Sequence, residues 1–308
     1  MPATLQGTGR TAAQAVMDRL RQIEIGAVTT HERVAIFPIF AAAGGGVSAL
    51  EYRTLAEALA DGSVRVAERE QASVPELVLQ NTGTTMVLIL DGEEIVGGRQ
   101  NRVVNASFLV PAHMTTPLPV TCVEHGRWHD TSPVFSSGEA SNMSMRSMKH
   151  AQVTASLRTS GRHLSDQGAI WDSVAHTSDL NRTSSPSGAM HDVYRSRASD
   201  ISSYQQAFPY VAGALGLLVA LNGQVVGADL FDQARTAEQV WPKLVRSYAL
   251  DALTGEPGAA IEREDAERLL EAARNARYEV FPSLALGEDV RFESDAVIGG
   301  GLVYQDLP

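Results

Sequence analysis

The sequence predicts an α+β fold: a mostly antiparallel β core with packed helices and a polar, partly helical central insertion. Three observations lead to this class. Short apolar runs separated by turn residues dominate the first 135 residues, and the dipeptides Asp91-Gly92 and Asn222-Gly223 favour antiparallel hairpins. Amphipathic helical patterns occur near both ends of the chain. The stretch 136–205 is polar, with few apolar residues.

Helices are expected where apolar residues recur at helical spacing. The segment 11–25 has this spacing, with Thr11 and Gln14 as a capping box and Gly26 as the expected C-cap. A short helix over 54–60 begins at a second capping box, formed by Thr54 and Glu57. Further helices are expected over 145–158, 165–176, 236–252 and 262–276.

Strands are expected where β-branched and aromatic residues gather between turn signals. In the first half of the chain these runs are 34–40, 64–67, 77–79, 86–90, 93–96, 103–110 and 118–123. After residue 205 they are 216–221, 224–231, 278–281, 290–292 and 296–304. We interpret the Asp91-Gly92 turn as the hairpin connection between the runs 86–90 and 93–96.

The chain is expected to form a single domain over 1–308, in three parts. These are a β-rich first half (27–135), a polar helical insertion (136–205) and an α/β C-terminal part (206–308). A segment as long as the insertion is rarely structureless inside a compact domain. Its low apolar content favours a lid or a wrapping arm rather than a contribution to the core.

Composition bounds the class of protein. The chain has 308 residues, 44% of them hydrophobic, and a net charge of −11, which argues against a general nucleic-acid-binding surface. Cys122 is the single cysteine, so no intrachain disulfide can form, which favours a reducing compartment. No apolar run reaches the roughly 20 residues of a membrane helix, and the first residues lack the apolar core of a signal peptide. We expect a cytoplasmic protein with no nucleic-acid or membrane partner.

The run from Asp91 to Arg102 mixes carboxylates, glycines, guanidinium groups and amides, which packing alone explains poorly. Paired glycines let a backbone approach a ligand closely, and arginines can form bidentate hydrogen bonds with phosphates or carboxylates. The alternative is a glycine-bearing hairpin rim with solvated charges. The candidate ligand-binding residues of this run are Gly97, Gly98, Arg99, Gln100, Asn101 and Arg102.

Three carboxylates are the candidate general bases: Glu93, Glu94 and Glu124. Glu93 and Glu94 are adjacent on an expected strand, so their side chains should point to opposite faces of the sheet. They are therefore not expected to form an acid/base pair with each other.

The segment 124–129 is the second candidate cluster. Arg127 could hold an anion and Trp128 could stack on a base or a sugar, or Trp128 could be a core anchor and Arg127 the ion-pair partner of Glu124. His125 and His129 have a spacing that metal ligands use. Cys122 is more typical of a buried small residue than of a nucleophile. Asp229 is expected to cap the following helix, with lining of a cleft as the alternative.

Several runs carry a family resemblance: Asp91 to Arg102, Cys122 to Trp128, Gly227 to Phe231 and Trp241 to Tyr248. Together they resemble the bacterial ADP-ribosylglycohydrolase- and rhodanese-phosphatase-associated protein domain family, over about 34–304. The resemblance implies a role in NAD or ADP-ribose metabolism, as an enzyme or as a binding module. It supplies neither catalytic residues nor a cofactor.

Three functional hypotheses follow. In the first, an enzyme or binding domain recognises ADP-ribose, NAD or a related phosphorylated nucleoside; it requires the arginines, Trp128 and the carboxylates to converge on one cleft. In the second, a non-catalytic scaffold docks on a partner enzyme, which predicts an exposed apolar patch and separated carboxylates. In the third, Glu124, His125 and His129 support metal-assisted hydrolysis.

Overall fold

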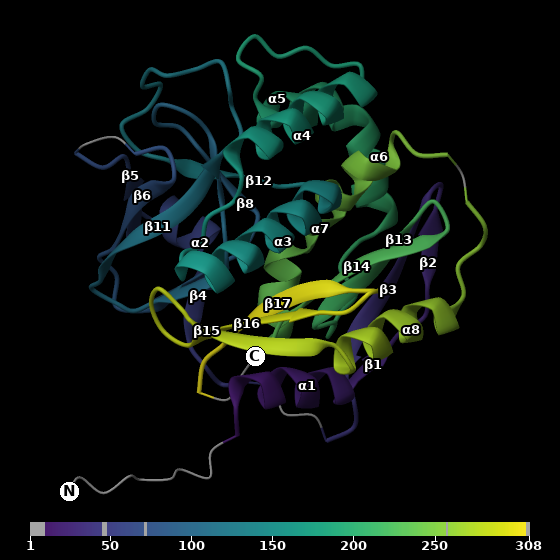
Figure 1. Cartoon of the computed structure of the whole chain (residues 1–308). Coiled ribbons are helices and arrows are strands. Elements are labelled where there is room, and N and C mark those ends of the chain that lie inside the picture. Colours follow the sequence, from purple (N-terminus) through teal and green to yellow (C-terminus); the bar gives the residue numbers. More distant parts are fainter. Residues whose placement is uncertain (1–9, 45–47, 71–72, 257, 306–308) are drawn as a thin grey trace, which may run out of the picture.

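A computed structural model describes residues 10–44, 48–70, 73–256 and 258–305. It shows an α+β fold with mostly antiparallel sheets and helices packed on their faces, as predicted (Figure 1). Among the described residues no helix is both long and apolar enough to cross a membrane.

One sheet joins the two halves of the chain. Its order is β1-β3-β13-β14, with β2 also pairing with β3, and all of its pairs are antiparallel. The Asn222-Gly223 hairpin is confirmed: both residues have positive φ and they connect β13 to β14. The strands are β1 (Ile23–Ile25), β2 (Thr29–His31), β3 (Val34–Ala41), β13 (Gly216–Leu221) and β14 (Gln224–Leu230).

Two further sheets contain the remaining strands of the first half, together with β12 from the start of the central region. The larger has the order β12-β8-β9-β11-β6-β5, and the smaller has the order β10-β7-β4 with one parallel pair, β4 with β7. Their strands are β4 (Tyr52–Thr54), β5 (Val64–Ala67), β6 (Glu76–Asn81), β7 (Met86–Ile89), β8 (Glu93–Val96), β9 (Arg102–Val104), β10 (Phe108–Val110), β11 (Thr115–Cys122) and β12 (Ser136–Ala140).

The expected hairpin at Asp91-Gly92 is wrong. A turn does form, with Gly92 at φ +80°, but β7 pairs with β4 and β10, whereas β8 pairs with β9 and β12. The turn therefore passes the chain from one sheet to another. A Cβ at Gly92 would lie 2.9 Å from Cδ of Arg146, so glycine also leaves room for that side chain.

The C-terminal sheet is the antiparallel meander β15 (Arg277–Pro282), β16 (Glu288–Glu293) and β17 (Ile298–Val303). Helix α1 (Ala12–Arg21) packs on it and contacts α8 (Arg263–Arg274), which packs on β14. Helix α3 (Met143–Ser160) contacts β17 and α7 (Ala234–Ala252), and α7 packs on β3 and β13. Figure 1 shows this meander between α1 and α3.

Two expected features of helix ends in the first helix are wrong. Thr11 caps α1 by accepting from the Gln14 N–H, but the Gln14 side chain bonds Asp18 and does not complete a capping box. The helix ends at Arg21, before Gly26, because 23–25 forms β1. The capping box of Thr54 and Glu57 at α2 (Leu55–Ala60) is confirmed.

The central region contributes to the core, contrary to expectation. It holds α3, α4 (Gln167–Leu180), α5 (Met190–Ser196) and α6 (Ala198–Ala207). The largest cluster of buried apolar side chains combines residues of these helices with others from β3, β13 and α7. The buried residues that this region supplies to the cluster are Met145, Ile170, Val174, Met190, Val193, Tyr194, Ile201 and Tyr204.

Candidate functional site

A cavity of about 520 Å³ lies between β14 and β17. Its volume is in the range of small-molecule sites. Helices α1 and α8 supply mainly apolar side chains, α3 and the β7–β8 turn supply charged ones, and β14 and β16 supply both kinds. The apolar group includes Val16, Leu20, Leu270 and Phe292, and the charged group includes Asp91, Arg146, His150 and Asp229.

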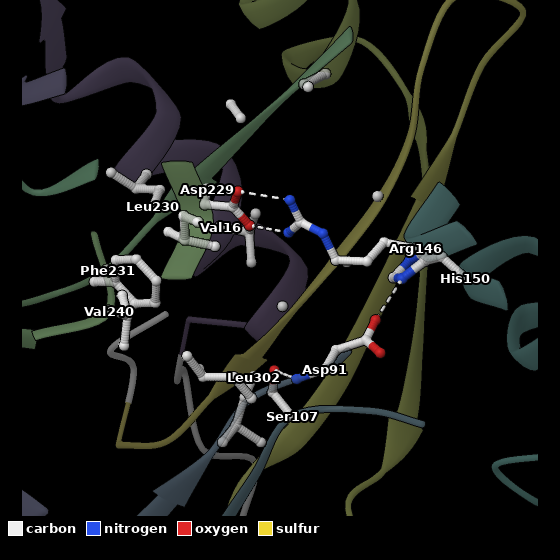
Figure 2. Close-up of a pocket in the computed structure, with 18 of the residues that line it drawn as sticks. Val16, Asp91, Ser107, Arg146, His150, Asp229, Leu230, Phe231, Val240 and Leu302 are labelled. Carbon is white, nitrogen blue, oxygen red and sulfur yellow. Dashed lines mark hydrogen bonds and ion pairs between the residues drawn. The ribbon is translucent and has the colours of Figure 1, made fainter. Parts of the chain in front are cut away.

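Arg146 and Asp229 form the centre of the charged wall. Nη1 of Arg146 lies 2.7 Å from Oδ1 of Asp229 and Nη2 lies 3.3 Å from Oδ2, a bidentate pair visible in Figure 2. The Tyr248 hydroxyl donates to Oδ2 of Asp229 at 2.8 Å, and burial and Asp229 raise the pKa of that phenol. Asp229 thus lines the cavity and holds Arg146 rather than capping a helix.

Asp91 anchors the neighbouring part of this wall. Its carboxylate contacts the ammonium of Lys149, whose side chain is 0% exposed, and lies 3.3 Å from Nδ1 of His150 (Figure 2). Burial alone would raise the pKa of Asp91, but Lys149 and His150 hold it well below its ordinary value. The carboxylate is therefore ionised at neutral pH and orients the imidazole.

A third acidic residue completes the wall. Each carboxylate oxygen of Asp289 accepts a hydrogen bond of 2.7 Å from Arg291, and Nε2 of His163 lies 2.9 Å from Oδ2 of Asp289. Burial opposes ionisation of Asp289, but His163 and Arg291 keep its pKa below the ordinary value. Nη1 of Arg291 also lies 3.1 Å from Nδ1 of His150. The three aspartates are thus matched by Arg146, Lys149 and Arg291, and the wall carries little net charge.

Few residues of this wall can be recognised from the sequence. The sequence places Asp91 at the start of a candidate run, offers the lining of a cleft as the alternative role of Asp229, and indicates Arg146 as a further anion contact. It does not point to the other residues of α3 or to β16. The spacing of Arg146, Lys149 and His150, which places them close together on one helix, was an available signal.

The candidate bases Glu93 and Glu94 lie on opposite faces of β8, in agreement with strand alternation. Glu93 lines the cavity, 3.3 Å from Nζ of Lys243. Glu94 is fully buried on the other face, where it lies 3.1 Å from Nδ1 of His191 and accepts from the Glu139 N–H. The bond to Glu94 raises the pKa of His191.

Glu124 and Arg127 form a buried ion pair, which we call the Glu124–Arg127 clamp. Nε and Nη2 of Arg127 donate to the two carboxylate oxygens at 2.8 and 2.6 Å, and Nη1 donates to the carbonyl oxygen of Gly98 at 2.6 Å. Glu124 also accepts from the Asn101 N–H, and these donors keep its pKa below the ordinary value despite burial. The clamp fixes the loop that contains Gly97 and Gly98.

Glycine is required in that loop. Gly97 and Gly98 have φ of +136° and +50°, a region in which other residues are strained. A Cβ at Gly98 would lie 2.4 Å from Cζ of Phe135. The glycines therefore serve tight packing here. Gln100 points into the same buried region and donates to the Glu124 carbonyl oxygen at 2.7 Å.

Arg102 is 0% exposed, and its hydrogen-bonding capacity is only partly used. Nη1 lies 3.5 Å from Sγ of Cys122, and Nη2 is 3.8 Å from Oε1 of Glu68. Nε and Nη2 have no hydrogen-bond partner within the described part of the chain. Cys122 is fully buried, and this burial raises the pKa of its thiol, which argues against a reactive thiolate.

Trp128 is a surface residue rather than a core anchor, with 48% of its surface exposed. The guanidinium carbons of Arg99 and Arg102 lie 5.6 and 5.9 Å from the centroid of its ring. Nε of Arg99 lies 3.9 Å from Oδ1 of Asp130, a distance longer than that of a hydrogen bond. We call the group Arg99, Arg102 and Trp128 the Trp128 platform.

The residues of the metal hypothesis do not form a metal centre in the described structure. Glu124 is engaged by Arg127, and the ring of His125 contacts that of Trp171, with centroids 4.3 Å apart and planes inclined at 54°. Across residues 10–44, 48–70, 73–256 and 258–305, no three His, Cys, Asp or Glu side chains are grouped to hold a metal ion.

Comparison with protein families agrees with the resemblance seen in the motifs. Residues 22–307 match the ARG and Rhodanese-Phosphatase-superfamily-associated Protein domain. The chain belongs to this family. ARG in this name denotes ADP-ribosylglycohydrolase. The name therefore records an association with ADP-ribosylglycohydrolases and with the rhodanese-phosphatase superfamily. No curated protein and no solved structure matches the chain.

Proposed function

We propose that this associated-protein domain binds an ADP-ribose-type ligand, a phosphorylated nucleoside, at the Trp128 platform. The observation that carries the proposal is a half-exposed indole ring with one guanidinium group at the surface and a second buried beside it. The family's association with ADP-ribosylglycohydrolases supports the choice of ligand class.

The platform offers the chemistry that such a ligand needs. An exposed indole face stacks on a nucleobase, which contributes about 1–3 kcal/mol per base. Arg99 is accessible and only loosely paired with Asp130, so its planar guanidinium group is available to bind a phosphate. Arg102 adds a second positive charge beside the ring, with two nitrogens that lack hydrogen-bond partners among the described residues.

The positions of the candidate bases favour binding over catalysis. Glu93 contacts Lys243, Glu94 contacts His191 and Glu124 is held by Arg127, so the three carboxylates lie in three separate environments. A general base must lie within hydrogen-bond reach of the proton that it removes. We therefore propose a binding domain that uses none of these three as a base.

Isothermal titration calorimetry with ADP-ribose tests the proposal. We expect binding to the wild type, and an affinity at least roughly fivefold weaker for Trp128→Ala, because the stacking contribution is lost. Arg99→Ala should also weaken binding. Arg277→Ala, which removes an arginine whose side chain is 74% exposed on β15, is the matched control and should bind as the wild type does. Absent binding, or wild-type affinity in Trp128→Ala, would refute the proposal.

Docking on a partner enzyme is the second candidate function, and a different observation favours it. The facing strands β14 and β17 each pair with one neighbour only among the described residues, so each has an unpaired edge beside the cavity. Unpaired strand edges are templates for pairing with another chain.

A further inference from the structure

The sheet that contains β14 and the C-terminal sheet lie in one layer. Helices α1 and α8 cover one side, where Val290 and Val303 share a core cluster with Leu218 and Leu270. Helices α3 and α7 cover the other side, where Asp229 holds Arg146. Strands β14 and β17 are the edges at which these two sheets face each other (Figure 1). Residues of both strands line the cavity, and Figure 2 shows part of this lining.

Hydrogen-bond alternation shows which backbone groups face this gap. The N–H of Phe231 donates to the carbonyl oxygen of Leu215, next to β13. Backbone groups alternate in direction along a strand, so the N–H and C=O groups two residues before Phe231 also face β13. The backbone N–H and C=O groups of Ala228 and Leu230 therefore face the gap. Ser294 donates to the Val297 carbonyl oxygen at the β16–β17 turn. By the same alternation the groups of Gly300 and Leu302 on β17 face the gap. All four residues line the cavity.

The gap has the length of a short strand. Its lining includes every residue of 225–230 on β14 and of 298–302 on β17. An extended chain rises about 3.3 Å per residue, so five or six residues of a third strand would match these edges. A strand in this position would satisfy both rows of backbone groups at once.

We propose that this slot, bounded by Ala228 and Leu230 on one side and Gly300 and Leu302 on the other, accepts an extended segment of a partner protein. The segment adds as a β-strand between β14 and β17 and joins the two sheets into one. The proposal concerns the docking role and is independent of ligand binding at the Trp128 platform.

The two walls of the slot define the sequence of the segment. Residues that face α1 and α8 meet Val16, Leu20 and Leu270 and should be apolar. Residues that face α3 meet Arg146 and His150, in a wall whose acidic and basic groups are already matched. An added charge would be buried there without a partner, so these residues should be polar and uncharged. The partner segment should therefore be a strand in which apolar residues alternate with uncharged polar residues.

A synthetic peptide tests the slot directly. The probe is a fluorescein-labelled Lys-Val-Thr-Val-Thr-Val-Lys peptide, and its binding is measured by fluorescence anisotropy. The wild type and Ala228→Ser, which keeps the backbone N–H, should bind equally. Ala228→Pro removes that N–H at an edge position where proline is tolerated, and should bind about two- to tenfold more weakly. Leu302→Pro on the facing edge should weaken binding similarly.

Matched controls make the outcome decisive. The melting temperatures of the proline variants show that they are folded, and a peptide methylated on alternate backbone nitrogens should not bind. Equal affinity for all variants and both peptides would overturn the proposal. So would a wild-type dimer, seen by size-exclusion chromatography, that disappears in Ala228→Pro, because the slot would then bind a second copy. Trp128→Ala should keep full peptide affinity, which separates this result from the ligand proposal.

Discussion

At the scale of single residues, the most consequential contact is the buried pair of Asp91 and Lys149. Lys149 lies on α3 with a fully buried side chain and also donates to the Val104 carbonyl oxygen at 2.8 Å. Asp91→Ala should leave this ammonium buried without its carboxylate, which costs about 3–5 kcal/mol of unfolding free energy. Urea denaturation measures the loss. Asp91→Ala/Lys149→Met should recover most of it, and a loss below about 1 kcal/mol in the single variant would contradict the argument.

The contact between His191 and Glu94 predicts a pH dependence of stability. The bond to Glu94 raises the pKa of His191 in the folded protein above its ordinary value of about 6.5. The stabilisation is therefore complete below the pKa of the unfolded state and is lost as pH rises through the folded pKa. The difference in melting temperature between the wild type and His191→Gln should be largest near pH 5.5 and shrink by pH 8.5. A difference that does not change with pH would refute this role.

Local rules predicted some residue contacts and missed others for a physical reason. Alternation along a strand separated Glu93 from Glu94, and the short spacing of Glu124 and Arg127 allowed their ion pair. The pair of Arg146 and Asp229 spans 83 residues, and that of Lys149 and Asp91 spans 58. No local pattern contains both members of such a pair, so the charged wall of the cavity could not be assembled from the sequence.

At the scale of elements, helices were more predictable than sheets. The Thr54 and Glu57 capping box and the apolar spacing of α8 are complete within one segment. Strand partners are not local. Asp91-Gly92 has the composition of a hairpin turn, yet it links strands of two different sheets. Turn residues specify the path of the backbone over a few residues, whereas packing decides which strands pair.

At the scale of the whole molecule, the three parts of the chain share their interior. The largest apolar cluster contains Val34 and Val103 from the first half, Tyr194 from the central region and Tyr248 from the C-terminal part. The low hydrophobicity of the central region predicted a lid or a wrapping arm, and this prediction is wrong because the region contributes to the core. Ile170 and Val174 on α4 and Met190 and Val193 on α5 lie on the inward faces of these helices, so a polar segment still contributes to the core.

This shared interior predicts a single cooperative unfolding transition. The central helices cannot detach without exposing side chains such as Tyr194 and Tyr204, which pack in the same cluster as residues of β3 and α7. The apolar surface of all three parts is therefore lost together. Differential scanning calorimetry should give one peak in which the calorimetric and van 't Hoff enthalpies agree. Two separable transitions, or early hydrogen exchange confined to 136–205, would show instead that the central region folds as an independent unit.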